Sequence, residues 1–232
     1  MEPMPEDWSR AIAVVAHPDD LEYGAASAIA RWTDQGKVVT YVLVTSGEAG
    51  IDAQTPDQVG PLREAEERAS AAVVGVSTVD FLGHADGLVE DGPALRRDIA
   101  GAIRRHRPDV VITMNFELTW GGVALNHLDH RVVGLATLDA CREAANRWLH
   151  PDLGEPWQGV QGAYVNATPS TTHYVDVTDT IERGVASLRE HRAYLAGLGT
   201  EFDPDAFLRE SAAGLGSEVG CAYAVGFQRY GV

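Results

Sequence analysis

Short apolar runs alternate along most of the chain with segments whose apolar residues have a helical spacing. The first run, 11–16, is apolar at every position, which is typical of a strand covered by helices on both faces. The segments that follow are predicted to be a helix at 21–32, a strand at 38–45, a helix at 62–74, a strand at 78–82, a helix at 93–105 and a strand at 109–113. This alternation predicts an α/β fold of the Rossmann-like, doubly wound kind, with a mainly parallel sheet and helices on both faces.

The pattern is less regular outside these segments. The polar stretch 51–60 is predicted to be a loop, and 146–162 gives no assignment. A long loop at 114–125 leads into a helix that runs to about residue 145, and loops of this length usually serve a site. The remaining predictions are strands near 163–165 and 173–177, helices at 180–195 and near 205–213, and an apolar tail at 219–227. With no internal repeat, residues 1–232 are expected to form one domain.

Charge and composition exclude several kinds of partner. The chain has 34 acidic and 18 basic residues, a net charge of −16, which argues against a nucleic-acid or anionic-membrane surface. No apolar run approaches the roughly 18 residues of a membrane span. The first residues lack the features of a signal peptide, and two distant cysteines, Cys141 and Cys221, do not suggest a disulfide framework. We therefore expect a cytoplasmic protein with no nucleic-acid or membrane partner.

The first strand ends in an unusual group of polar residues. His17, Asp19 and Asp20 follow it directly, with Pro18 between them. Open α/β sheets bind their ligands at the carboxyl ends of the strands, so these side chains are expected to face a site. A dinucleotide is not the expected ligand, because this turn lacks the Gly-x-Gly-x-x-Gly fingerprint.

A second polar group follows the fourth predicted strand. His127 and His130 stand three residues apart at the start of a helix, with Asp129 between them. His17, Asp20 and His130 together would make a three-ligand site with open positions, the pattern of a catalytic metal. Such ligands suit Zn²⁺, and Fe²⁺, Co²⁺ and Mn²⁺ accept them too.

Metal-assisted hydrolysis is the chemistry that these residues indicate. A divalent metal lowers the pKa of its bound water, and Asp19 would take the proton as that water attacks. His127 would stabilise the developing oxyanion and protonate the leaving group, while Asp129 would orient a histidine. Plainer alternatives are a packing role for His17 and helix capping for the aspartates.

Candidate substrate contacts come from loops at the same edge of the sheet. Glu48 and Asp86 could bind sugar hydroxyls, although either could be a solvated loop acid. Arg63 could contact substrate or pair with a glutamate in its own helix. Asn115 and Trp120 lie on the long loop and could hydrogen-bond to and stack on a pyranose ring. The other histidines are expected to be surface or core residues: His84, His106, His150, His173 and His191.

Several motifs together resemble the LmbE-like, or PIG-L, family of zinc-dependent de-N-acetylases. They are 16–20 (Ala-His-Pro-Asp-Asp), 126–130 (Asn-His-Leu-Asp-His), 44–48, 63–67, 81–87 and 107–111. The resemblance is strong over about residues 10–145 and weak over 181–192. The chain departs from the family pattern at three places: Leu21 followed by Glu22, Ala25 with Ala26, and Leu128. None of these departures removes a ligand, so they bear on substrate contacts rather than on hydrolysis.

The resemblance implies hydrolysis of an acetamide on an amino sugar or a sugar-containing small molecule. It implies His17, Asp20 and His130 as metal ligands, Asp19 as general base and His127 as its electrostatic or acid partner. An N-acylated sugar would be the substrate, and family members often form homo-oligomers. Two other functions remain open: an amidase for a larger thiol or sugar conjugate, and a catalytically silent, metal-containing binding protein.

Overall fold

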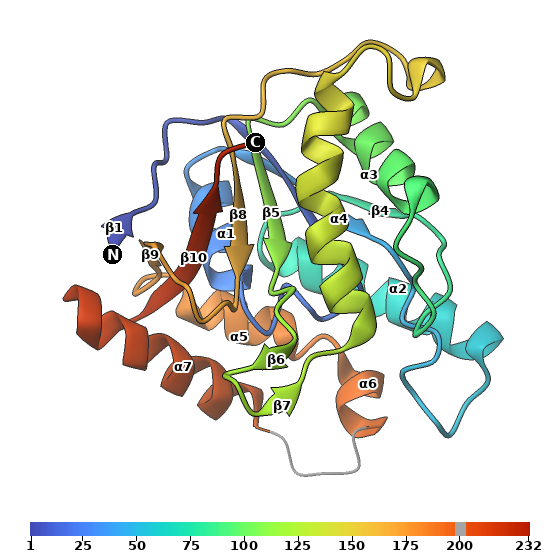
Figure 1. Cartoon of the computed structure of the whole chain (residues 1–232). Helices are drawn as coiled ribbons and strands as arrows, with labels where there is room; N and C mark the ends of the chain where they lie inside the picture. Colours follow the sequence, from blue (N-terminus) through green and yellow to red (C-terminus); the bar gives the residue numbers. More distant parts are fainter. Residues whose placement is uncertain (198–202) are drawn as a thin grey trace.

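The computed structural model describes residues 1–197 and 203–232, and an eight-stranded sheet forms its centre (Figure 1). In spatial order the strands are β1 (Glu2–Pro3), β9 (His173–Asp176), β10 (Ala224–Tyr230), β8 (Gly162–Asn166), β5 (Val110–Met114), β2 (Arg10–Val15), β3 (Val38–Leu43) and β4 (Thr78–Phe81). Only β10 runs antiparallel to its neighbours, so the sheet is mainly parallel, as predicted. Strands β2 and β5 are buried at nearly every position, as expected for strands with both faces covered.

Helices cover both faces of the sheet (Figure 1). One face carries α1 (Ala26–Asp34), α2 (Pro56–Val73) and α5 (Ile181–Leu188), and the other carries α3 (Pro93–His106) and α4 (Leu128–Ala145). The shorter elements and the last helix are β6 (Thr119–Trp120), β7 (Ala124–Leu125), the 3₁₀ helix Pro151–Leu153, α6 (Arg192–Gly197) and α7 (Pro204–Val219). The doubly wound α/β prediction is confirmed. In the described part of the chain, we find no helix with the length and apolar character that a membrane span requires.

Several predicted boundaries are wrong. The helix predicted at 62–74 begins at Pro56, because Thr55 and Gln58 form a capping box there and the helix tolerates Pro61 in its interior. The helix predicted at 21–32 begins only at Ala26, after a series of turns. The helix predicted at 180–195 is two helices, α5 and α6, separated by a short break. The apolar tail continues into the strand β10, which inserts between β8 and β9.

The strand order determines where a site can form. From β2 the chain moves through α1 and α2 toward β4, and it then returns through α3 to place β5 on the other side of β2. The connections after β2 and β5 therefore leave in opposite directions and open a crevice at their carboxyl ends. The 17–20 turn follows β2, and the 126–130 segment lies between β5 and β8 at this crevice.

Candidate metal and catalytic site

The turn after β2 brings the first group of polar side chains into the crevice. The Asp20 carboxylate folds back on this turn and accepts a hydrogen bond from the His17 backbone N–H at 2.7 Å. Its other oxygen lies 3.1 Å from Nε2 of His130, so it links the two chain segments. Although burial alone would raise the pKa of Asp20, the adjacent histidines hold it well below its usual range.

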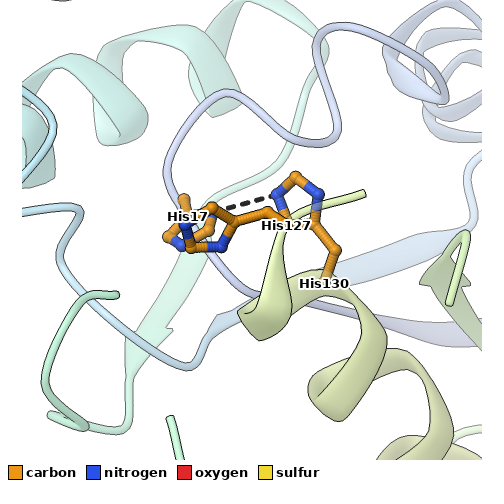
Figure 2. A group of neighbouring side chains, drawn as sticks. All are labelled: His17, His127 and His130. Carbon is orange, nitrogen blue, oxygen red and sulfur yellow. Dashed lines mark hydrogen bonds between the residues drawn. The ribbon is translucent and has the colours of Figure 1, made fainter. Parts of the chain in front are cut away.

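The start of α4 supplies the second group. His127 is the N-cap residue, and its Nδ1 accepts a hydrogen bond from the backbone N–H of Asp129. His130, one turn inside, has its Nδ1 3.0 Å from the Asn126 side-chain oxygen. This contact leaves Nε2 of His130 facing Nδ1 of His17 at 3.1 Å, and the three imidazoles gather at one point (Figure 2).

Two carboxylates fix the other side of the His17 ring. Nε2 of His17 lies 3.2 Å from Asp129 and 3.1 Å from Asp86. Asp129 is itself held by the backbone N–H groups of Gly87 and Val89. Burial alone would lower the pKa of His17, but the surrounding carboxylates, Asp129 foremost, raise it well above its usual value.

These contacts test whether the residues fit a metal. Tetrahedral ligands with bonds of about 2.0–2.1 Å lie about 3.3 Å apart. The facing nitrogens of His17 and His130 lie 3.1 Å apart, Nε2 of His130 lies 3.1 Å from Asp20, and Nδ1 of His17 lies 3.7 Å from Asp20. These three distances fall on either side of this value. The outer nitrogen of each histidine contacts a carboxylate or an amide oxygen, which fixes the ring orientation as in known metal sites. The three side chains therefore fit a divalent metal.

Asp19 stands beside these residues in a different environment. Its side chain is almost fully buried, with one oxygen 3.1 Å from the Arg63 guanidinium. The second oxygen, Oδ2, has no hydrogen-bond partner among the described residues. Burial raises the pKa of Asp19 to about 6, against the opposing effect of Arg63. A carboxylate with this pKa can accept a proton near neutral pH.

His127 presents one nitrogen to the crevice. Because its Nδ1 accepts a backbone hydrogen bond, the ring proton of the neutral form is assigned to Nε2. Burial and the neighbouring His17 lower the pKa of His127, which favours this neutral form. Its Nε2–H can therefore donate a hydrogen bond to a substrate oxygen.

The sequence matches the PIG-L family, described as GlcNAc-PI de-N-acetylase, over residues 12–141. This span exceeds half of the 232 residues and contains both polar groups of the site. The chain belongs to the PIG-L family. The resemblance noted from the motifs is thus confirmed.

Relatives of this PIG-L family member include named deacetylases. Diacetylchitobiose deacetylase of Thermococcus kodakarensis is 28% identical over 228 residues, which cover 96% of this chain and 83% of that protein. A 1D-myo-inositol 2-acetamido-2-deoxy-alpha-D-glucopyranoside deacetylase of Rhodococcus erythropolis is 31% identical over 208 residues, 78% of this chain and 66% of that protein. The solved structure of N,N'-diacetylchitobiose deacetylase from Pyrococcus horikoshii superposes with a TM-score of 0.87 at 24% identity, over 97% of this chain and 85% of that one, so the fold is shared.

The predicted substrate-binding residues of this PIG-L chain divide into two sets. A cavity of about 900 Å³ opens at the site, and Arg63, Asp86 and Trp120 line it. Glu48 and Asn115 do not line it: Glu48 accepts the Asp86 backbone N–H, and Asn115 is fully buried with its oxygen bonded to the Glu117 N–H. Arg63 is only 3% exposed. Its guanidinium donates hydrogen bonds to the Pro18 and Gly47 carbonyls, forms an ion pair with Asp19 and stacks on the Tyr194 ring.

Behind Asp19 lies a buried group of ionisable side chains that the sequence pattern does not predict. Glu22, Glu67 and His191 are each at most 1% exposed, and the His191 ring lies 3.6 Å from both carboxylates. Glu67 also accepts the Asp19 backbone N–H at 3.2 Å. The sequence predicts His191 as a surface or core residue, and the structure buries it in the break between α5 and α6. The one available signal was the placement of two acids, Glu22 and Glu67, in otherwise buried segments.

Proposed function

We propose that this PIG-L family member is a zinc-dependent hydrolase that removes the acetyl group from the amine of an amino sugar or a sugar-containing small molecule. One observation carries the proposal: His17, Asp20 and His130 converge in a cavity beside a buried Asp19, and the Oδ2 atom of Asp19 has no hydrogen-bond partner in 1–197 or 203–232. The names of the relatives, which are deacetylases of N-acetylated sugars, support the substrate class. The donor set of two imidazoles and one carboxylate supports zinc.

The proposed mechanism assigns one task to each side chain. A divalent metal held by His17, Asp20 and His130 would polarise the acyl carbonyl and lower the pKa of water toward about 7. Asp19 takes a proton from the attacking water through Oδ2 and passes it to the departing nitrogen. His127 donates a hydrogen bond from Nε2 to the carbonyl oxygen as negative charge develops there. Water adds to the carbonyl carbon, the C–N bond breaks, and acetate and a free amine result.

Asp86 and Asp129 keep His17 in the orientation that this arrangement needs. Both carboxylates face Nε2 of His17, so Nδ1 is directed toward His130. We therefore assign Asp86 to the support of His17 in addition to any contact with sugar hydroxyls. The cytoplasmic location and the homo-oligomeric state stay predictions.

Acetate release from a panel of N-acetylated amino sugars tests the proposal. Each substrate is incubated with the purified protein as isolated, after chelation, and after chelation followed by Zn²⁺. We expect release that chelation abolishes and Zn²⁺ restores. Absence of release from protein shown by elemental analysis to hold its metal would contradict the proposal.

A further inference from the structure

The cavity extends well beyond the metal ligands. It follows the edge of the sheet from the end of β2 past β5 and β8 to the start of β10, where Ala224, Val225 and Gly226 line it. We call the part of the cavity that extends from the end of β2 to β10 the arm. Three strand spacings of about 4.8 Å separate these two strands, so the arm reaches about 14 Å from the site. Side chains of α7 also line it, and α7 lies beside β10 (Figure 1). Both α7 and β10 lie outside the matched residues 12–141, so the far end of the arm is built by a part of the chain that the family match does not cover.

The arm differs chemically from the site. Among the described residues, the charged and imidazole side chains that line the cavity all belong to the site: His17, Asp19, Asp20, Arg63, Asp86, His127 and His130. The arm is lined instead by apolar side chains such as Ile181, Leu208, Ala212, Leu215 and Val225. The chain as a whole is 22% charged, so an uncharged arm is a specific feature of this surface.

Of the polar side chains in the arm, Asn166 and Thr171 are engaged within the protein, while two hydroxyl residues, Ser27 and Ser211, also line it. The Asn166 amide donates to the Gly226 carbonyl at 3.0 Å, and the Thr171 hydroxyl donates to the Thr168 carbonyl at 3.1 Å. A second sugar ring would need free hydrogen-bonding groups to replace the water on its hydroxyls. The arm offers few of these, and it therefore suits an apolar group better than a second sugar.

We propose that the arm binds an apolar substituent, an alkyl chain or a comparable hydrocarbon group, carried by the N-acylated sugar. This inference rests on the proposed function and narrows its substrate class. The substituent has two chemical sources: the acyl group that is removed, or an aglycone that stays on the amine product. Either source would place the same kind of hydrocarbon in the arm. The two differ in their products, because an acyl chain leaves with the carboxylic acid and an aglycone stays on the amine.

Three substrates test the inference: N-acetylglucosamine, N-octanoylglucosamine and octyl N-acetylglucosaminide. Each buried methylene contributes about a fourfold gain in binding, so we expect at least a 10²-fold higher kcat/KM for one of the octyl compounds, an order-of-magnitude figure. Preference for the octanoyl compound assigns the arm to the acyl group, and preference for the octyl glycoside assigns it to the aglycone. Equal kcat/KM for all three overturns the inference and leaves the proposed function standing. Hydrolysis of none of them by the metal-loaded protein overturns both.

Two adjacent alanines of α7 provide a matched pair of variants. Ala212 lines the arm and is 6% exposed, whereas Ala213 does not line it. Ala212→Phe fills the arm, so we expect the ratio of kcat/KM for the preferred octyl compound to that for N-acetylglucosamine to fall at least tenfold, whereas Ala213→Phe leaves this ratio unchanged. If Ala212→Phe fails to fold, Ser211→Phe at the exposed rim of the same arm takes its place. An octyl preference that persists in the folded arm-filling variant overturns the inference.

Discussion

Asp19 has a backbone conformation that residues with a side chain rarely adopt. Its φ of +92° lies in the region that favours glycine. The peptide group that joins Pro18 to Asp19 is held at both ends from α2: Arg63 donates to its carbonyl, and Glu67 accepts from its N–H at 3.2 Å. Since Arg63 and Glu67 stand one helical turn apart, α2 fixes the plane of this peptide and hence the direction of the Asp19 side chain.

Glu67→Ala should therefore impair turnover without removing the metal. We expect kcat to fall at least about tenfold with metal content retained, because Asp19 loses the contact that holds its backbone. Burial and the adjacent Glu22 raise the pKa of Glu67 well above its usual range, so a neutral amide is a close substitute. Glu67→Gln should accordingly restore most of the activity. Steady-state kinetics, elemental analysis and thermal unfolding of both variants check this, and unchanged kcat in folded Glu67→Ala would contradict it.

Asp19 and His130 should respond to substitution in different ways. Asp19→Asn keeps the shape of the side chain but cannot take a proton, so we expect full metal content and a loss of about 10²–10⁴ in kcat. His130→Ala removes a proposed ligand, so the metal should be lost together with the activity. Elemental analysis and acetate release measured on the same samples separate the two roles. Near wild-type turnover in Asp19→Asn, or full metal occupancy in His130→Ala, would show the corresponding role to be wrong.

Local spacing predicted the residues that gather at the site better than it predicted those that support them. The site residues form two groups that are each close in sequence and follow a strand: His17, Asp19 and Asp20, and His127 and His130. The rule that open α/β sheets bind ligands at the carboxyl ends of their strands was therefore enough to predict that the two groups meet. The backbone of Asp19 is supported by Glu67, 48 positions away, and Glu67 in turn lies 3.6 Å from His191, which is a further 124 positions along the chain. A buried ionisable group with a distant partner has no periodic signature, so sequence patterns could not find this contact.

Some helices pack so closely against their neighbours that only glycine fits at the contact, and the sequence alone does not show which glycines have this role. Gly134 in α4 lies where an added Cβ would be 2.8 Å from the Met114 carbonyl oxygen and 2.9 Å from the Phe116 side chain. Gly101 in α3 lies where a Cβ would meet only the Leu153 methyl groups, at 3.6 Å. The hydrophobic pattern predicted both helices but could not distinguish these two glycines, because the difference lies in what packs against each.

Alanine at these two glycines should change stability in opposite directions. Gly134→Ala forces α4 away from the end of β5, and we expect it to lower the free energy of unfolding by about 1–3 kcal/mol. Gly101→Ala fits its site and gains helix propensity, so a rise of up to about 1 kcal/mol is expected. Urea unfolding of both variants and the parent protein measures the difference. Similar changes of the same sign would contradict the packing of α4 on β5 described above.

At the scale of the whole molecule, acidic residues outnumber basic ones by 34 to 18, and the site adds to this excess. Three carboxylates, Asp20, Asp86 and Asp129, surround one imidazole, that of His17. In the metal-free protein they keep a proton on His17, because they raise its pKa well above the usual value. A metal cation would replace this proton as the positive charge at the centre of the group.

Metal binding and pH should therefore be coupled through His17. A raised pKa in the folded state stabilises the metal-free protein below the unfolded pKa of about 6.5, and this contribution is lost as pH rises through the folded pKa. A metal must displace the proton, so its affinity should increase with pH over the same range. Asp20, Asp86 and Asp129, whose pKa values are lowered, stay ionised throughout and change stability only in more acidic solution. Asp19 and Glu67, whose pKa values are raised by burial, act in the same direction as His17 and add to the loss of stability as pH rises.

The melting temperature of the metal-free protein should thus fall from pH 6 to pH 9, while the increase in melting temperature produced by a fixed Zn²⁺ concentration should grow. Calorimetric titration with Zn²⁺ in buffers of different ionisation heat should show net proton release. His84, paired with Asp98 outside the site, provides the control: His84→Gln should keep both the release and its pH dependence. Zinc binding without proton release near pH 7 would show that His17 is already neutral, and the carboxylates around it would then not set the charge of the site.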